Sequence, residues 1–461
     1  MLRLRAEAPP GALVLRPVLE GGEPHPSGFE GRPGQVLELH PKLRWVGADG
    51  ASNAPQWEAV GAACIRAAGE AARVAIDARG LPDAVAVALG AGAVLRAWRF
   101  EALQPRRTPG PRRLSLLVDD PDRAAPLWAR AKAGLDGALL ARELVAEPAN
   151  RLHPREFARR LKALEAEGLE VEVLKPAQLR KLGAGGLLAV GQGAAEGPRL
   201  VILRWKGAFA APPVAFVGKG ICFDTGGISI KPAQGMEKMR GDMAGAAACA
   251  GAMLALARRN SPCPAVAVLA LAENATSGHA YRPGDVLRML SGRTVEIIDT
   301  DAEGRLVLAD ALHYAAMRFK PQAILDLATL TGSVVTALGT HRAGLYGNEA
   351  ALGAAVAAAG EAVGERLWPL PIGEAHRRDL DSPIADLRQC APAGPLLPDA
   401  CHAAAFLREF VGLLPWAHLD IAGVSEEAGE EGLAPRHGPT GFGARLLDAL
   451  VERHFEDPHR V

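Results

Sequence analysis

The chain carries no excess of charge of either sign and has few cysteines. Lysine and arginine number 52, as do aspartate and glutamate, so the formal net charge is zero. Proteins that bind nucleic acid neutralise phosphates with basic surfaces, so this balance argues against nucleic acid as the main partner. The six cysteines form no Cys-x-x-Cys pair, which argues against a cysteine zinc site or a disulfide framework and points to a reducing compartment.

Long apolar runs are also missing. The two longest, near residues 243–257 and 264–272, are too short or too rich in glycine and alanine to cross a bilayer, which needs about 20 residues. Residues 1–10 lack the uninterrupted apolar core of a signal peptide. We therefore expect a cytoplasmic protein with no membrane partner.

The remaining composition is that of a folded, globular protein. Hydrophobic residues make up 49% of the chain and charged residues 23%, which excludes extensive disorder. At about 150 residues per domain, 461 residues favour two domains.

Periodicity divides the chain near residue 147. Residues 1–147 predict a small α/β domain that ends in a long linking helix starting at Pro121. Its other elements are strands at 12–18, 36–40 and 114–118 and helical segments over 55–80 and 81–100. In residues 148–461, helices alternate with strands, among them 199–205, 213–217, 265–270, 294–298 and 323–327. This alternation predicts a three-layer α/β domain with a largely parallel mixed sheet.

A glycine-rich segment after the 213–217 strand contains Lys219, Asp224 and Lys231. Ligands bind at the carboxyl ends of strands in open α/β sheets, so its position suits a site. A phosphate-binding loop or a simple tight turn is the alternative, although the Walker pattern is absent. Only ten of the 52 basic residues are lysine. Lysine, unlike arginine, can become neutral, and two lysines here favour chemistry over packing.

Two further acidic segments follow. Asp242 precedes the small-residue run 244–251, where it is expected in the first turn of a helix, and the helix dipole alone could explain it. Asp301 and Glu303 come after the 294–298 strand, and on an extended segment their side chains point the same way. Such a pair needs a cation between the carboxylates, unless it is a solvated acidic turn. Arg305 could hold a carbonyl or an anion.

Together the four carboxylates of Asp224, Asp242, Asp301 and Glu303 provide enough oxygen ligands for two divalent metal ions. No His-Glu-x-x-His motif occurs, which excludes the histidine-based zinc proteases that carry it. Paired metal ions activate water and polarise a carbonyl or phosphoryl group. The residues alone therefore predict a hydrolase without naming its substrate.

These segments resemble the leucyl aminopeptidase (cytosol aminopeptidase) family over roughly residues 140–450. Residues 299–306, Asp-Thr-Asp-Ala-Glu-Gly-Arg-Leu, are nearly the signature octapeptide of that family, and Lys219, Asp224, Lys231 and Asp242 match its metal-binding run at the same spacings. Further matches lie at 272–274, 281–285, 326–332, 416–423 and 440–443.

The resemblance implies a cytoplasmic homohexameric aminopeptidase that removes leucine and other apolar residues from the N-termini of short peptides. A first, tighter metal ion would be held by Lys219, Asp224, Asp242 and Glu303, and a second by Asp224, Asp301 and Glu303. Mn or Zn is expected, with Mg or Co also possible.

It also implies roles for residues around these ligands. Lys231 would polarise the scissile carbonyl, and Arg305 would hold a bicarbonate ion that serves as the general base. The side-chain pocket and the contacts to the peptide backbone would be formed by Met239, Thr329, Leu330 and Gly332.

Two departures from the family pattern stand out. The signature usually begins with asparagine, and here Asp299 adds a negative charge behind the site. A glycine-rich, threonine-containing run is replaced by residues 393–402, Ala-Gly-Pro-Leu-Leu-Pro-Asp-Ala-Cys-His. Two alternatives stay open, a narrow dipeptidase acting on substrates such as Cys-Gly and a non-catalytic, DNA-binding architectural role.

Overall fold

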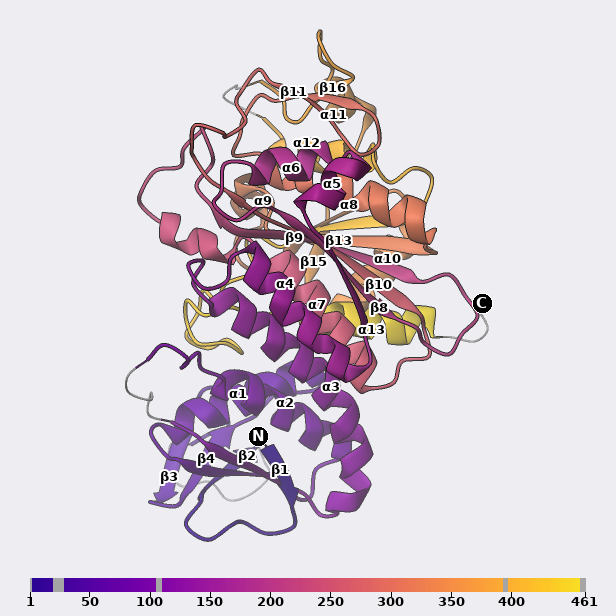
Figure 1. Ribbon diagram of the computed structural model, residues 1–461. Helices are drawn as coiled ribbons and strands as arrows, with labels where there is room; N and C mark the ends of the chain where they lie inside the picture. The colour runs from indigo at the N-terminus through magenta and orange to yellow at the C-terminus, as the bar shows by residue number, and fades with distance from the viewer. Residues whose placement is uncertain (1, 20–28, 105–109, 393–396, 457–461) are drawn as a thin grey trace. The chain divides into compact units, whose positions relative to one another are not determined.

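Contacts divide the chain into two compact units. The computed structural model describes residues 2–19, 29–104, 110–392 and 397–456. The first unit comprises Met1–Leu135, Ala362–Gly364 and Glu426–Thr440, and the second comprises Asp136–Glu361, Glu365–Ser425 and Gly441–Val461 (Figure 1). The division falls inside a long helix, and the domain boundary between residues 147 and 148 stays a prediction.

The first unit is built on a six-stranded sheet of order β1-β6-β5-β2-β4-β3, in which only β3 is antiparallel to its neighbour. Its strands are β1 (Leu2–Arg5), β2 (Leu13–Val18), β3 (Val36–His40), β4 (Leu43–Gly47), β5 (Arg73–Asp77) and β6 (Arg113–Leu117). Its helices are α1 (Ala54–Ala68) and α2 (Asp83–Ala97), and α3 (Pro121–Ala146) continues into the second unit.

Helices α1 and α2 touch through their backbones. A Cβ at Gly61 would lie 2.0 Å from the Leu89 carbonyl oxygen, and one at Gly92 would lie 1.8 Å from the Glu58 carbonyl oxygen. The prediction of helix throughout residues 55–80 is wrong. Helix α1 ends at Ala68 and is capped by Gly69, which has φ 58°. The strand β5 follows, with Val74 and Ile76 buried in the sheet.

The second unit contains the larger sheet, of order β15-β14-β17-β13-β9-β10-β8-β7. Its strands are β7 (Glu170–Leu174), β8 (Arg199–Trp205), β9 (Val214–Asp224), β10 (Ala265–Asn274), β13 (Ala323–Ala328), β14 (Ala343–Gly347), β15 (Leu367–Pro369) and β17 (Trp416–Asp420). The four central strands β10, β9, β13 and β17 are parallel to one another.

The second unit also contains many helices. They are α4 (Pro154–Lys162), α5 (Pro176–Leu182), α6 (Gly185–Gly191), α7 (Ala244–Arg258), α8 (Glu303–Phe319), α9 (Gly332–Leu338), α10 (Ala350–Val363), α11 (Glu374–Arg378), α12 (Asp399–Arg408) and α13 (Ala444–Leu450), with 3-10 helices η1 (Ala163–Glu167) and η2 (Met236–Gly241) and a π-helix η3 (Val451–Phe455). None of the helices in the described ranges is long and apolar enough to cross a membrane.

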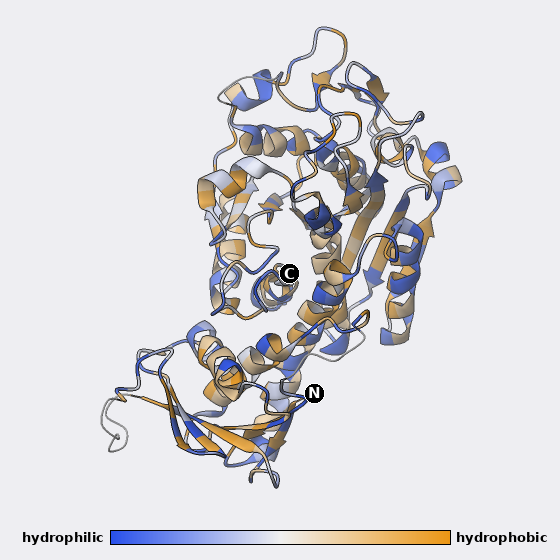
Figure 2. Cartoon of the chain, turned by 90° about the vertical axis from the view of Figure 1, so that its left-hand side faces the viewer, coloured by the Kyte–Doolittle hydropathy of each residue, from blue (hydrophilic) through white to orange (hydrophobic). Residues whose placement is uncertain are grey.

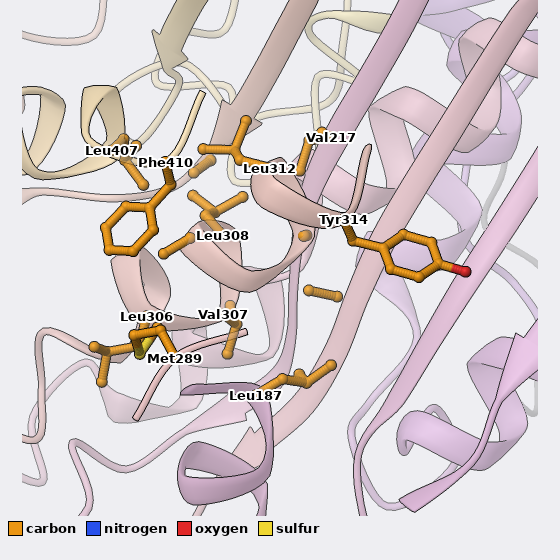
Figure 3. Packing of buried hydrophobic residues seen from close by; sticks show 14 of the residues in the cluster. Leu187, Val217, Met289, Leu306, Val307, Leu308, Leu312, Tyr314, Leu407 and Phe410 are labelled. Carbon is orange, nitrogen blue, oxygen red and sulfur yellow. The ribbon is translucent and has the colours of Figure 1, made fainter. Parts of the chain in front are cut away.

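Helices α7 and α8 cover opposite faces of β9. Successive side chains of a strand point to opposite faces. A Cβ at Gly218 would lie 2.5 Å from Ala246 Cα in α7, whereas Val217 packs in one cluster with Leu308 and Leu312 of α8 (Figure 3). Helix, sheet and helix therefore form three layers, which confirms the predicted fold class.

A separate three-stranded sheet lies in the same unit. Its order is β11 (Val286–Arg288), β12 (Thr294–Glu296) and β16 (Leu387–Arg388). The segment 294–298, predicted as a buried strand, is therefore a short strand of this small sheet and lies outside the large one. Figure 2 shows hydrophobic residues running along the strands of both larger sheets, which places the cores where the periodicity predicted them.

A charged pair lies inside the large sheet. Asp326 of β13 and His418 of β17 are register partners, and both are fully buried. Asp326 Oδ1 lies 2.6 Å from His418 Nδ1, and Asp326 Oδ2 accepts a 2.7 Å hydrogen bond from Trp416 Nε1. Burial lowers the pKa of His418, but the adjacent Asp326 more than offsets this, so the pKa is raised above its usual range.

The substitution Asp326→Asn should destabilise the protein by about 1–3 kcal/mol, because one amide oxygen cannot serve both donors. The histidine has a higher pKa in the folded protein than in the unfolded chain, where it is about 6.5. Its contribution to stability is therefore fully present below about pH 6.5 and is lost as the pH rises through the folded-state pKa. The stability difference from the wild type should thus be largest in acid and shrink towards alkaline pH. Unfolding followed by circular dichroism at several pH values measures it, with the exposed Asp381→Asn as control. A difference that grows with pH would contradict a charged His418.

Candidate metal centre

The candidate residues gather at the carboxyl ends of the parallel strands. Asp224 is the last residue of β9, Lys219 lies in the middle of the same strand, and Thr329 directly follows β13. Asp242 directly follows η2, and Glu303 is the first residue of α8. This edge is where open α/β sheets bind ligands.

Two local expectations are corrected by the structure. Asp242 lies two residues before α7 and not in its first turn. The segment from Asp301 to Glu303 is not extended, because α8 begins at Glu303, where the helix dipole favours an acidic side chain. Both side chains still reach the other acids through a lysine. Lys231 contacts Asp301 and Asp224, and Lys219 contacts Glu303 and Asp242.

Lys219 lies at the centre of the group. Its Nζ is 2.8 Å from Asp242 Oδ1 and 2.8 Å from Glu303 Oε1, and it donates a hydrogen bond of 2.9 Å to the carbonyl oxygen of Thr329. The residue is only 3% exposed. Burial lowers the pKa of Lys219, but the surrounding carboxylates raise it by more, so its net direction is upward.

Lys231 joins the other two acids. Its Nζ is 2.8 Å from Asp224 Oδ2 and also contacts Asp301 Oδ1. With 20% of its side chain exposed, Lys231 is more accessible than Lys219. The two lysines therefore divide the acids into two pairs. Asp242 and Glu303 around Lys219 are both buried, whereas in the pair around Lys231 Asp224 is buried and Asp301 is 34% exposed.

The acids are crowded. Ligand oxygens of Asp224, Asp242 and Glu303 lie within 4.8 Å of one another. Burial, followed by the charge of Asp224, raises the pKa of Asp301 to about 7, and the same two causes raise the pKa of Glu303. Burial likewise raises the pKa of Asp242, whose Oδ2 is buried without a partner among the described residues. A divalent cation would satisfy that oxygen and reduce the repulsion, so these residues fit a metal ion.

A supporting layer holds the ligands. Asn274, at the end of β10, donates from Nδ2 to Asp224 Oδ1 at 2.8 Å and to the Thr300 carbonyl oxygen at 3.0 Å. That carbonyl also accepts a 2.8 Å hydrogen bond from the Tyr281 hydroxyl. Sequence reasoning assigned these residues no role. Asn274 and Tyr281 fall in segments that matched the family pattern, which is the signal that could have found them.

Asp299, which replaces the usual asparagine, has a local role. Its Oδ1 accepts a 2.9 Å hydrogen bond from the Asp301 backbone N–H. An asparagine oxygen could accept the same bond. The substitution therefore keeps the turn while adding a charge.

Of the four expected substrate residues, Thr329 and Leu330 contact the residues of the cluster. Thr329 is tied to it, since its hydroxyl donates to Asp242 Oδ1 at 2.7 Å. Leu330 packs over Gly304, where a Cβ would lie 2.9 Å from its Cδ1. Met239 is partly buried in η2, and Gly332 is exposed at the start of α9. The roles of these four residues in binding substrate stay predictions.

Arg305 is paired with an anion of its own. Its Nη2 donates to Asp399 Oδ1 at 2.9 Å and its Nη1 donates to the Gln389 carbonyl oxygen at 3.1 Å. The guanidinium is 3% exposed, whereas the Asp399 side chain is 39% exposed. Asp399 belongs to the unusual segment 393–402, of which residues 393–396 lie outside the described residues.

Comparison with known proteins identifies the family. The model for the cytosol aminopeptidase family, catalytic domain, matches residues 139–448. The chain belongs to this family. Cytosol aminopeptidases are metal-dependent peptidases, so the chain is an enzyme of the hydrolase class.

Individual relatives match nearly the whole chain. A probable cytosol aminopeptidase of Caulobacter vibrioides is 44% identical and covers 98% of this chain and 93% of its own. Another, of Methylobacterium radiotolerans, is 46% identical and covers 87% of this chain and 80% of its own. A solved structure described as the bottromycin maturation enzyme BotP in complex with Mn is 37% identical, with a TM-score of 0.87 over 96% of this chain and 99% of that one.

Gly304→Ala should impair metal binding while the protein still folds. A Cβ there would lie 2.6 Å from Lys219 Cε and 2.7 Å from its Nζ, and this flexible end of the lysine would move away from Asp242 and Glu303. Elemental analysis after dialysis should show at least one metal ion lost. Gly353→Ala in helix α10, where a Cβ meets open space, is the matched control. Full metal content in the Gly304 variant would contradict this geometry.

Proposed function

We propose that this enzyme removes N-terminal residues, preferably leucine and other apolar residues, from short peptides with the help of two metal ions. The observation that supports it most is the convergence of buried Asp224, Asp242 and Glu303 around Lys219 at the strand ends. The family of the chain supports the reaction type. Divalent metal ions in such a site supply an activated water and polarise a carbonyl group.

The proposed ligand sets of the two ions overlap, because Asp224 and Glu303 belong to both. Lys219, Asp224, Asp242 and Glu303 would hold the more buried ion, while Asp224, Asp301 and Glu303 would hold the more open one. The solved relative described with Mn makes that metal the first candidate, followed by Zn, Mg and Co.

Other side chains of this enzyme would bind and orient the peptide. The Lys231 ammonium would donate a hydrogen bond to the scissile carbonyl oxygen and stabilise the negative charge that develops there. Met239 and Leu330 would contact the N-terminal side chain, and Thr329 and Gly332 would bind the peptide backbone. We further propose a cytoplasmic homohexamer, which light scattering would reveal by its mass.

The direct test is hydrolysis by the purified protein loaded with Mn or Zn. Leucinamide and leucyl peptides should be cleaved, and the same peptides with an acetylated N-terminus should not. Cleavage of Cys-Gly alone would favour a narrow dipeptidase. Absence of any hydrolysis together with a shift of duplex DNA on a gel at moderate salt would favour an architectural role.

The two lysines should respond differently to replacement by arginine. Lys219→Arg should lose the more buried ion, because a guanidinium cannot give up its proton to become a metal ligand. Position 219 is also only 3% exposed, which leaves little room for the larger side chain. Lys231→Arg should keep both ions but lower kcat by roughly 10²- to 10³-fold, because the charge is misplaced at the substrate oxygen. Elemental analysis and steady-state kinetics measure both effects. Two ions retained in Lys219→Arg would remove Lys219 from the ligand set.

A further inference from the structure

We propose that Asp399 is a built-in replacement for the bicarbonate ion expected at Arg305, so that this enzyme needs no bicarbonate. This inference rests on the proposed peptidase function and adds a proton-accepting residue to it. It begins from a misfit, because the guanidinium that should bind the free anion already holds a carboxylate of its own chain, at 2.9 Å.

The electrostatics of Arg305 require one anion and disfavour a second. A buried guanidinium without a counter-charge is strongly destabilising, and Arg305 is 3% exposed. Asp399 Oδ1 provides that charge. The guanidinium in turn lowers the pKa of Asp399, so the carboxyl group is ionised. A bicarbonate ion at the same guanidinium would meet the negative charge of Asp399 at close range.

The surrounding fold holds Asp399 in place. It is the first residue of α12, where the helix dipole favours a negative side chain. Helix α12 packs against α8, the helix that carries Arg305. Ala403 and Phe406 of α12 are fully buried, and His402 Nε2 of the same helix lies 3.0 Å from Asp379 Oδ2. The carboxylate and the guanidinium therefore project from two helices that are packed together.

Asp399 also retains an oxygen for chemistry. Oδ1 is bound to Arg305, whereas Oδ2 has no hydrogen bond to any described residue, and the side chain is 39% exposed. In the proposed step, a proton of the attacking water passes to Asp399 Oδ2 and then to the departing amine. The water oxygen bonds to the acyl carbon and the C–N bond breaks, so the carboxylate is regenerated.

Two substitutions at this position separate the anion from the space that it fills. Asp399→Ala removes the carboxylate and opens room at Arg305, so activity in CO₂-free buffer should fall by roughly 10²-fold or more. Added bicarbonate should then restore much of it. Asp399→Asn removes the charge but still fills the space, so bicarbonate should not rescue it. The wild type and the exposed-surface control Asp381→Asn should be insensitive to bicarbonate.

Binding is measured separately from activity. Titration with bicarbonate should raise the Tm of Asp399→Ala but not that of the wild type, and elemental analysis should find equal metal content in both. This readout holds even if the chain proves inactive on peptides, so failure of the proposed function is distinguishable from failure of this inference. Stimulation of the wild type by bicarbonate, loss of metal from Asp399→Ala, or its full activity without bicarbonate would each overturn the inference.

Discussion

Repulsion between buried carboxylates is the constraint on which this site depends. Asp224, Asp242 and Glu303 bring oxygens within 4.8 Å of one another, and all three residues are buried. Three negative charges cannot share that space unless positive charge enters it or protons remain bound. In the structure Lys219 and Lys231 provide the positive charge. Such a site favours the binding of metal ions, because the buried carboxylates bring together negative charge that a cation can balance.

The backbone around the acids has to approach unusually closely for this arrangement to exist. Gly304 leaves room for the end of Lys219, since a Cβ would come within 2.7 Å of its Nζ. Gly226 has φ 85°, and a Cβ there would lie 2.4 Å from the Ser229 carbonyl oxygen. Only glycine fits such positions without strain. Gly226 and Gly304 therefore affect the electrostatics of the site, because they allow the charged groups to lie close together.

The sequence predicts the chemical groups of the site better than their connections. Lys219 and the acids could be recognised because their motifs lie on short stretches of chain beside buried strands. Asp399 could not be recognised as a partner of Arg305, because 94 residues separate them and only the packing of two helices brings them together. Asn274 was missed for the same reason, since its contact with Asp224 joins the ends of two adjacent strands.

The fold shows a similar division. Strands with continuous apolar runs were predicted near their true positions, but β9 was expected to stop at Val217 and in fact continues to Asp224. Gly218 and Gly220 interrupt the apolar pattern. A Cβ at Gly218 would meet the backbone of α7 at 2.5 Å, and one at Gly220 would lie 2.4 Å from Leu271 Cδ2 of the neighbouring strand β10. The prediction of a helix over residues 55–80 was wrong because the segment is rich in alanine, which favours a helix. Its last part is the short strand β5, which is stabilised by pairing with β2 and β6.

Arg305 illustrates why a shared signature does not transfer every part of a mechanism. The octapeptide fixes the guanidinium on α8, two residues after Glu303, but the anion opposite comes from another helix. That helix begins in the segment where this chain departs most from the family pattern. A free ion requires an open space at the guanidinium, whereas a side chain requires only a residue at the correct helical position. The same buried cation can therefore be balanced either way, and the choice depends on residues outside the signature.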